Sequence, residues 1–179
     1  MQNKFTLQEY QANFLQNPRH KNGLPYCMLG ERPYMLESDL THAAMRLAYA
    51  AHHGQLDKAG APYIFHPYHL AEQMPDEITA CVALLHDVLE DTSVTLEELE
   101  AMFPPAITEA VSLLTRKPDM DYWDYIRALR YHPVARTVKL ADLSHNGDAS
   151  RLACLPPAEQ ARLQAKYDQA RAILEGVLP

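Results

Sequence analysis

Residues 78–89 form a nearly unbroken apolar segment that ends in a cluster of ionisable side chains. A helix that is apolar on every side must be buried on every side. We therefore expect a helix over residues 76–91 to lie at the centre of the domain. Its last turns read His86-Asp87-Val88-Leu89-Glu90-Asp91. Because such groups are costly to bury without a compensating partner, the segment that organises the core is also the first candidate site.

The rest of the chain predicts an all-α fold. From residue 38 onward apolar residues recur at helical spacing, and no run alternates as a strand does. Ser38 or Asp39 is placed to cap a helix that ends near Gly54. Pro67 is placed as a first helical residue, with His66 at the cap. Further helices are expected near residues 95–103, 105–114, 121–131, 133–147 and 157–176. The prediction is a compact helical bundle over residues 38–179.

Residues 1–37 differ from this pattern. Proline and glycine recur there every few positions and the apolar pattern is weak. We predict a loop-rich N-terminal extension, in which residues 26–34 form a short hairpin or an extended arm.

The composition limits the classes of partner. The chain has 16 Lys and Arg against 23 Asp and Glu, a net charge of -7, so a generally basic nucleic-acid-binding surface is not expected. The three cysteines are widely spaced and favour reduced thiols over a disulfide framework or a zinc finger. No stretch reaches the roughly 18 apolar residues of a membrane span. We expect a cytoplasmic protein with no membrane or nucleic-acid partner, and its oligomeric state stays open.

Two other segments carry side chains that match the first cluster. One places His66 at a helix start, and the other places Asp142 and Asn146 one turn apart on a largely apolar helix. With His86 and Asp87 they make a mixed nitrogen and oxygen set that suits Mn²⁺, Fe²⁺, Zn²⁺ or Mg²⁺. Taken alone, the first cluster is better explained by a satisfied core pair and a solvated helix end, because perturbed or buried ionisable groups are often only structural. The three segments together favour a metal centre with open positions, and therefore catalysis.

Taken together, these residues resemble the HD-domain metal-dependent phosphohydrolases, and among them the hydrolase domain of the Rel/SpoT homologues. The resemblance covers roughly residues 40–152. It rests on four ordered segments: Ala51-His52-x-Gly54-Gln55, Lys58-x-Gly60-x-Pro62-Tyr63-Ile64-x-His66-Pro67, Leu85-His86-Asp87-x-x-Glu90-Asp91-Thr92 and Lys139-Leu140-Ala141-Asp142-x-x-His145-Asn146. It implies an HD-domain bundle and a small alarmone hydrolase of the stringent response, which removes the 3′-pyrophosphate from (p)ppGpp.

The resemblance also implies roles for individual residues. The metal ligands, which usually hold Mn²⁺, would be His66, His86, Asp87 and Asp142. The acidic pair that orients or activates water would be Glu90 and Asp91. The substrate contacts would be Lys58, Asn146 and, by a looser correspondence, Tyr167.

Several other residues have predicted positions outside the metal, acidic and substrate sets given above. Arg46 on the first helix and Arg151 after the Asp142 helix are candidate phosphate contacts. We expect His52 and His145 to be buried supports, with His145 backing Asp142, and we expect His69 at the surface.

Two departures from the family pattern bear on the substrate. The family's arginine that packs on the guanine base is replaced by Asp57, and Leu143-Ser144 stand where the family usually has a basic residue. Neither departure touches the predicted metal set.

The leading hypothesis is therefore an alarmone hydrolase. Because the chain ends at Pro179, we expect no synthetase domain, and so degradation of the alarmone without its synthesis. The alternatives are an HD phosphohydrolase for another nucleotide, such as a nucleoside monophosphate or NADPH, and a catalytically silent module that binds metal or nucleotide.

Overall fold

The computed structural model describes residue 36 and residues 38–178. They belong to the second of two units into which the chain divides, Tyr34–Pro179. The predicted arm or hairpin at residues 26–34 lies outside the described residues. The described part is all-α, as predicted, and its backbone forms one isolated bridge, between Leu56 and Pro62, but no strand.

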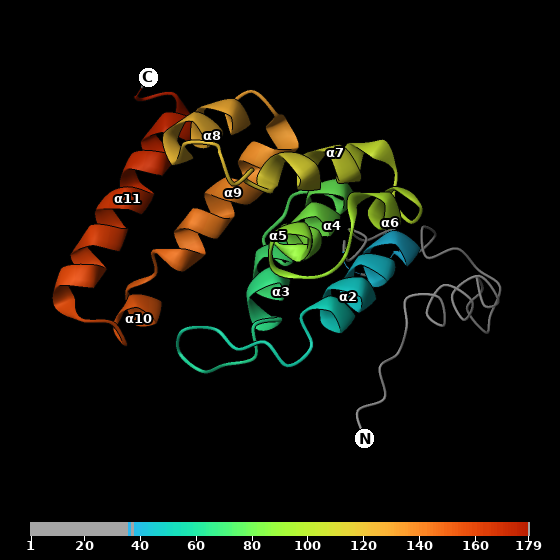
Figure 1. The fold of residues 1–179 in the computed structure, drawn as a ribbon, viewed down its shortest axis with the longest axis horizontal. Helices are drawn as coiled ribbons and strands as arrows, with labels where there is room; N and C mark the ends of the chain where they lie inside the picture. The colour runs from blue at the N-terminus through green and yellow to red at the C-terminus, as the bar shows by residue number, and fades with distance from the viewer. Residues whose placement is uncertain (1–35, 37, 179) are drawn as a thin grey trace. The chain divides into compact units, whose positions relative to one another are not determined.

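Apart from the long loop of residues 52–64 between α2 and α3, the described helices follow one another through short connections (Figure 1). In chain order they are α2 (Asp39–Ala51), α3 (Phe65–Ala71), α4 (Glu77–Leu85), α5 (Val88–Asp91), α6 (Leu96–Glu100), α7 (Pro105–Leu114), α8 (Tyr122–Leu129), α9 (Pro133–Asn146), α10 (Ala149–Leu152) and α11 (Pro157–Glu175).

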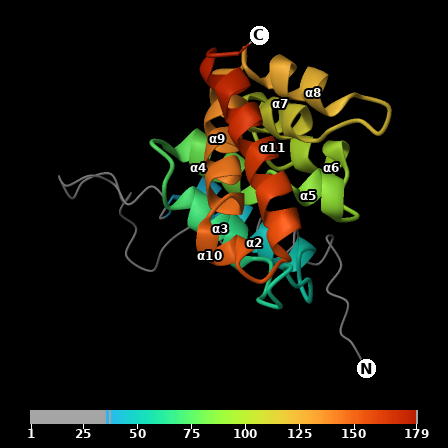
Figure 2. The ribbon, with the colours of Figure 1, turned by 90° about the vertical axis from the view of Figure 1, so that its left-hand side faces the viewer.

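Helix α4 is the central element of the domain. It packs against α2, α3, α7 and α9. Every residue from 80 to 85 has a relative exposure of 0%. The apolar segment is thus buried on all sides, as its composition requires. Helix α11 lies along α9 and also packs on α8 (Figure 2).

Side-chain caps set the first residues of several helices. Ser38 accepts a hydrogen bond from the backbone of Thr41, whose hydroxyl bonds back to the Ser38 backbone. Asp76 and Thr79 form the same reciprocal box before α4. Each box satisfies backbone N–H groups that the first turn of a helix leaves without partners. The cap predicted at Ser38 is confirmed.

Three helix predictions need correction. The single helix expected over 76–91 is divided into α4 and α5 at residues 86 and 87. Helix α3 begins at Phe65, so Pro67 is its third residue and His66 lies inside the first turn. Proline is tolerated there because the N–H groups of the first turn have no intrahelical acceptor. Helix α10, four residues long and capped by Asp148, was not predicted.

No helix within the described range is long and apolar enough to cross a membrane.

We predict that Leu84→Ala in α4 lowers the free energy of unfolding by about 2 to 5 kcal/mol, because the cavity it leaves is enclosed by core side chains. Leu113→Ala is the matched control, since Leu113 is 42% exposed on α7, and it should cost less than about 0.5 kcal/mol. Urea unfolding of both variants measures the difference. Equal losses would contradict the central place of α4.

Candidate functional site

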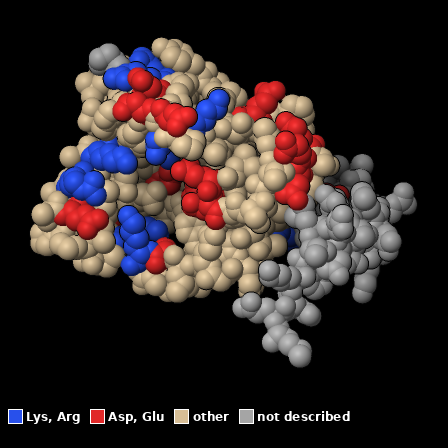
Figure 3. Space-filling view, in the orientation of Figure 1, with Lys and Arg blue, Asp and Glu red and all other residues tan. Residues whose placement is uncertain are grey.

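A cavity of about 650 Å³ brings together residues from the loop before α3, the α4–α5 junction, α9, α10 and α11. On this face the surface is hollowed, with basic side chains on the α11 side and acidic ones opposite (Figure 3). Of the predicted site residues, the cavity is lined by Lys58, His66, Asp87, Glu90, Asp91, Asp142, Asn146 and Tyr167. His86 lies buried behind the cavity wall. Arg46 is exposed on α2 and does not line the cavity.

The break between α4 and α5 is made by the His86 side chain. Its Nδ1 lies 2.8 Å from the carbonyl oxygen of Ala83. In a continuous helix that carbonyl accepts from the backbone N–H of Asp87. The His86 imidazole donates to this carbonyl in place of the Asp87 N–H. Helix α4 ends at Leu85, and Asp87 adopts φ −105° and ψ 0°. The same bond assigns the Nδ1 proton, which leaves Nε2 as the free ligand atom of the ring.

Three buried groups converge at the cavity floor, His66 and Asp142 in its lining and His86 behind them. His66, His86 and Asp142 each offer a ligand atom, and these atoms all lie within 4.8 Å of one another. His66 Nε2 is 3.2 Å from Asp142 Oδ1, and the two imidazole rings meet edge to face with centroids 5.2 Å apart. The three come from α3, the end of α4 and α9, so the tertiary packing of these elements creates the cluster.

His86 Nε2 supplies an independent sign that the cluster fits a cation. This atom is buried and makes no aligned hydrogen bond to the described residues, although Asp87 Oδ2 lies 2.9 Å away. Burial is the largest single effect and lowers the pKa of His86, but the charges of Asp87 and Asp142 and the contacts with Asp87 and Ala83 together outweigh it and raise the pKa to about 9. A divalent ion bound here must therefore displace a proton.

Asp142 is the carboxylate of the cluster and is only 5% exposed. Its Oδ2 accepts from Lys139 Nζ at 2.8 Å, and its Oδ1 accepts from Asn146 Nδ2 at 2.5 Å. Burial is the largest single effect and opposes ionisation, but the Lys139 charge, the contact with His66 and the charges of His66 and His86 together outweigh it and hold the pKa of Asp142 far below its usual range. The role of Lys139 was not predicted, although the lysine stands in the motif that contains Asp142.

Asp87 lies beside the cluster but outside it. Its Oδ2 accepts a short hydrogen bond from the hydroxyl of Tyr63 and faces His86. Burial is the largest single effect and raises the pKa of Asp87, but the charge of His86, the contact with that ring and the Tyr63 hydrogen bond together outweigh it and lower the pKa to about 2. The carboxylate is therefore ionised and held in place. No role was predicted for Tyr63, and only its place in a quoted motif pointed to it.

His145 supports His66 and not Asp142, contrary to expectation. The two Nδ1 atoms are 2.6 Å apart and the rings stack with an angle of 8° between their planes. When His66 Nδ1 is the donor of this bond, the ring has the tautomer that leaves its Nε2 free to bind an ion. His69 is exposed, as predicted, and its ring lies 4.3 Å from that of His145.

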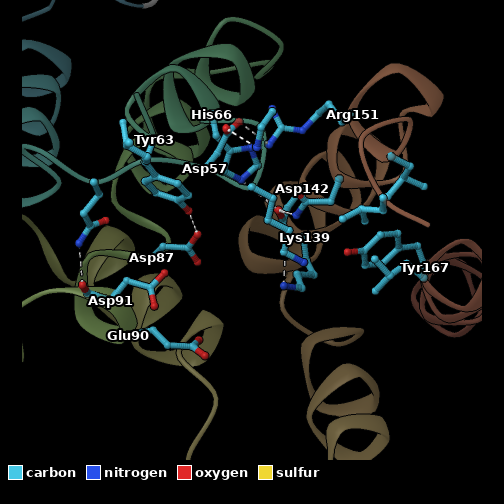
Figure 4. Close-up of a pocket in the computed structure, with 18 residues that line it drawn as sticks. Asp57, Tyr63, His66, Asp87, Glu90, Asp91, Lys139, Asp142, Arg151 and Tyr167 are labelled. Atoms are coloured by element: carbon cyan, nitrogen blue, oxygen red, sulfur yellow. Dashed lines mark hydrogen bonds and ion pairs between the residues drawn. The ribbon is translucent and has the colours of Figure 1, made fainter. Parts of the chain in front are cut away.

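Glu90 and Asp91 form an acidic wall of the cavity (Figure 4). Partial burial and the charge of Asp87 raise the pKa of Asp91, which makes its carboxylate a stronger base. Gln55 holds this end of α5, because its Nε2 donates to the Asp91 carbonyl oxygen at 2.9 Å. Gln55 Oε1 lies 2.8 Å from Nδ1 of His52, which is buried as predicted.

The geometry agrees with a family match over residues 44–146, to the family described as HD domain. The chain belongs to the HD-domain family. This match confirms the predicted fold and the predicted class, a metal-dependent hydrolase, and an HD domain implies that a divalent metal is bound.

Two curated relatives are each 33% identical to the chain. The probable GTP pyrophosphokinase of Mycobacterium leprae (strain TN) matches over 153 residues, 78% of this chain and 18% of the relative. The bifunctional (p)ppGpp synthase/hydrolase SpoT of Escherichia coli (strain K12) matches over 135 residues, 67% of this chain and 19% of the relative. The HD-domain chain thus spans about a fifth of the length of these relatives.

A solved structure of a metazoan orthologue of SpoT, described as hydrolysing ppGpp, has a similar fold. The TM-score is 0.62 at 24% sequence identity, and the match covers 78% of this chain and 87% of that one. At this identity the similarity establishes the shared fold.

We predict that His66→Ala and Asp142→Ala each abolish tight binding of Mn²⁺, because each removes a ligand atom from the buried cluster. Calorimetric titration of the metal-stripped protein measures the affinity. His53→Ala is the control, since His53 is exposed at the end of α2, and it should bind as the unsubstituted protein does. Full affinity in either cluster variant would refute the cluster as the metal site.

We predict that Tyr63→Phe weakens Mn²⁺ binding by roughly 10-fold to 100-fold, as loss of a group that orients a ligand does. The same titration applies. Tyr68→Phe is a matched control, because the Tyr68 hydroxyl donates to the backbone of Met45 and not to a cavity residue. If both variants lose affinity equally, the Tyr63 hydroxyl has no specific effect on Asp87.

Proposed function

We propose that this HD domain is a Mn²⁺-dependent hydrolase that removes the 3′-pyrophosphate of (p)ppGpp and thereby degrades an alarmone of the stringent response. The proposal rests on one observation above all: a single cavity joins the buried His66–His86–Asp142 cluster to an acidic pair and to several cations. Names of relatives support the substrate, since SpoT of Escherichia coli is described as a (p)ppGpp synthase/hydrolase.

We assign four residues to the metal: His66, His86, Asp87 and Asp142. The nitrogen and carboxylate donors suit Mn²⁺, and Fe²⁺, Zn²⁺ and Mg²⁺ remain alternatives to be tested. When bound, such an ion would supply positive charge to a phosphoryl oxygen and lower the pKa of bound water toward neutrality. The residues of the chain perform the remaining steps.

Asp91 and Glu90 are the proposed proton acceptors. Each lines the cavity beside Asp87, and the raised pKa of Asp91 suits a general base. The acceptor takes a proton from the water that attacks the phosphorus of the 3′-diphosphate. The bond from that phosphorus to the ribose oxygen breaks, which yields pyrophosphate and GDP or GTP.

Basic side chains lie on the opposite side of the cavity. Lys58, Lys139 and Arg151 line it, and of these Lys139 is paired with Asp142 and Arg151 with Asp57. We assign Lys58 to phosphate. Asn146 already donates to Asp142, so its substrate contact would be made through its other amide atoms.

Tyr167 completes the proposed substrate contacts from α11. The proposed partner is a small nucleotide alone, in the cytoplasm, with no nucleic acid or membrane involved.

The experiment is an incubation of the purified, Mn²⁺-loaded protein with ppGpp, pppGpp, a panel of nucleoside monophosphates and NADPH. We expect pyrophosphate from the two alarmones. Release of phosphate alone would overturn the alarmone assignment in favour of another nucleotide. Metal binding without turnover would favour a silent module.

We predict that Asp91→Asn and Glu90→Gln keep Mn²⁺ but lower turnover by roughly 10² to 10⁴, the range that a general base contributes. Pyrophosphate release and metal titration are both measured. Glu100→Gln on α6, an exposed site away from the cavity, should change neither. Unchanged turnover in both cavity variants would remove these carboxylates from the reaction.

A further inference from the structure

An ion pair joins two walls of the cavity that are far apart in the sequence. Asp57, in the loop before α3, has Oδ2 at 3.4 Å from Nη2 of Arg151 on α10. The side chains are 11% and 29% exposed, respectively. Both residues line the cavity, and Figure 4 shows Arg151 on the opposite side of the cavity from Glu90 and Asp91.

Asp57 is rigidly placed for this contact. Its Oδ1 accepts from the backbone N–H groups of Ala59 and Ala61, at 2.9 and 3.0 Å. Its own backbone N–H donates to the Ala61 carbonyl oxygen at 2.8 Å. One carboxylate oxygen therefore closes the loop, and the other is directed at Arg151. An acid that is already committed in this way positions the guanidinium and has little surface left for a ligand.

Arg151 shares the cavity wall with apolar side chains. Leu152 follows it in the chain, and Leu155 and Leu163 also line the cavity. The Asp57 charge offsets the Arg151 charge, which makes the pair a weaker receptor for a polyanion than an unpaired cation is. The guanidinium nevertheless keeps its flat faces and most of its five N–H donors. A neutral pair bordered by leucines suits a flat, neutral heterocycle better than it suits a phosphate.

We propose that Arg151, positioned by Asp57, contacts the nucleobase of the substrate and favours guanine over adenine. The inference rests on the proposed nucleotide hydrolase activity. Guanine presents two acceptors, O6 and N7, to a forked donor, whereas adenine presents N7 beside a 6-amino donor. An arginine can therefore donate two hydrogen bonds to guanine, whereas on adenine one of its N–H groups faces the 6-amino donor.

Steady-state kinetics with ppGpp and its adenosine counterpart ppApp test this contact. The variants are Arg151→Lys, which keeps the charge and loses the fork, and Asp57→Asn, which keeps the Oδ1 acceptor and loses the charge. The matched controls are Arg127→Lys and Asp124→Asn, because these residues form an exposed pair on α8.

We expect the unsubstituted protein to prefer ppGpp in kcat/KM by roughly 10-fold to 100-fold, as one two-bond contact to a base allows. Arg151→Lys should reduce the preference toward unity through KM, with kcat nearly unchanged, and Asp57→Asn should reduce it in part. The controls should keep it. An equal loss for both nucleotides would place Arg151 on a phosphate and overturn the proposal, as would an unaltered preference.

Failure of the proposed function gives a different result. If the unsubstituted protein releases pyrophosphate from neither nucleotide, the alarmone hydrolase assignment falls. Equilibrium binding of GDP and ADP then decides the base contact by itself. A preference for GDP that Arg151→Lys abolishes supports the contact, and equal binding of GDP and ADP to the unsubstituted protein refutes it.

Discussion

Asp142 places a negative charge inside an apolar bundle, and the arrangement of the cavity floor follows from the need to balance it. A buried carboxylate without partners costs several kcal/mol. Lys139 and Asn146 lie on the same side of α9 and bind its two oxygens, and His66 approaches from α3. The Lys139 ammonium also lies 5.7 Å from the Tyr125 ring. The carboxylate is therefore held in one position before any ion or substrate binds.

The second requirement is a histidine that reaches this carboxylate from the core. Residues 80–85 of α4 can be fully buried because none of them carries a charged, hydroxyl or amide side chain, and the ligand comes directly after the last of them, Leu85. The His86 ring donates a hydrogen bond to the Ala83 carbonyl oxygen. The helix therefore ends beside the site. The core and the site are thus one structure: the helix that stabilises the domain also fixes the imidazole.

The sequence predicted what depends on local structure. Spacing and caps gave the helices, because each is decided within a few residues. The break at His86 was not predicted, because it depends on the orientation that the His86 ring takes in the packed core, where it bonds to the Ala83 carbonyl oxygen. Two contacts of the site acids were also not predicted. Tyr63 is 24 residues from Asp87, so their contact has no local signal. Lys139 stands three residues before Asp142, a helical spacing that could have indicated their contact. Contacts across elements follow from tertiary packing, which periodicity does not report.

Pairing also explains how a chain of net charge -7 can accept a substrate with several phosphates. Asp57 is matched by Arg151, Asp87 by His86 and Asp142 by Lys139. The acids nearest the ligand are mostly compensated where they stand, and the wall formed by Glu90 and Asp91 faces the proposed point of attack. Since screening limits interactions with distant surface charges to about 8 Å at physiological salt, these local pairs decide the field inside the cavity. Net charge therefore says little about which ligand the cavity takes.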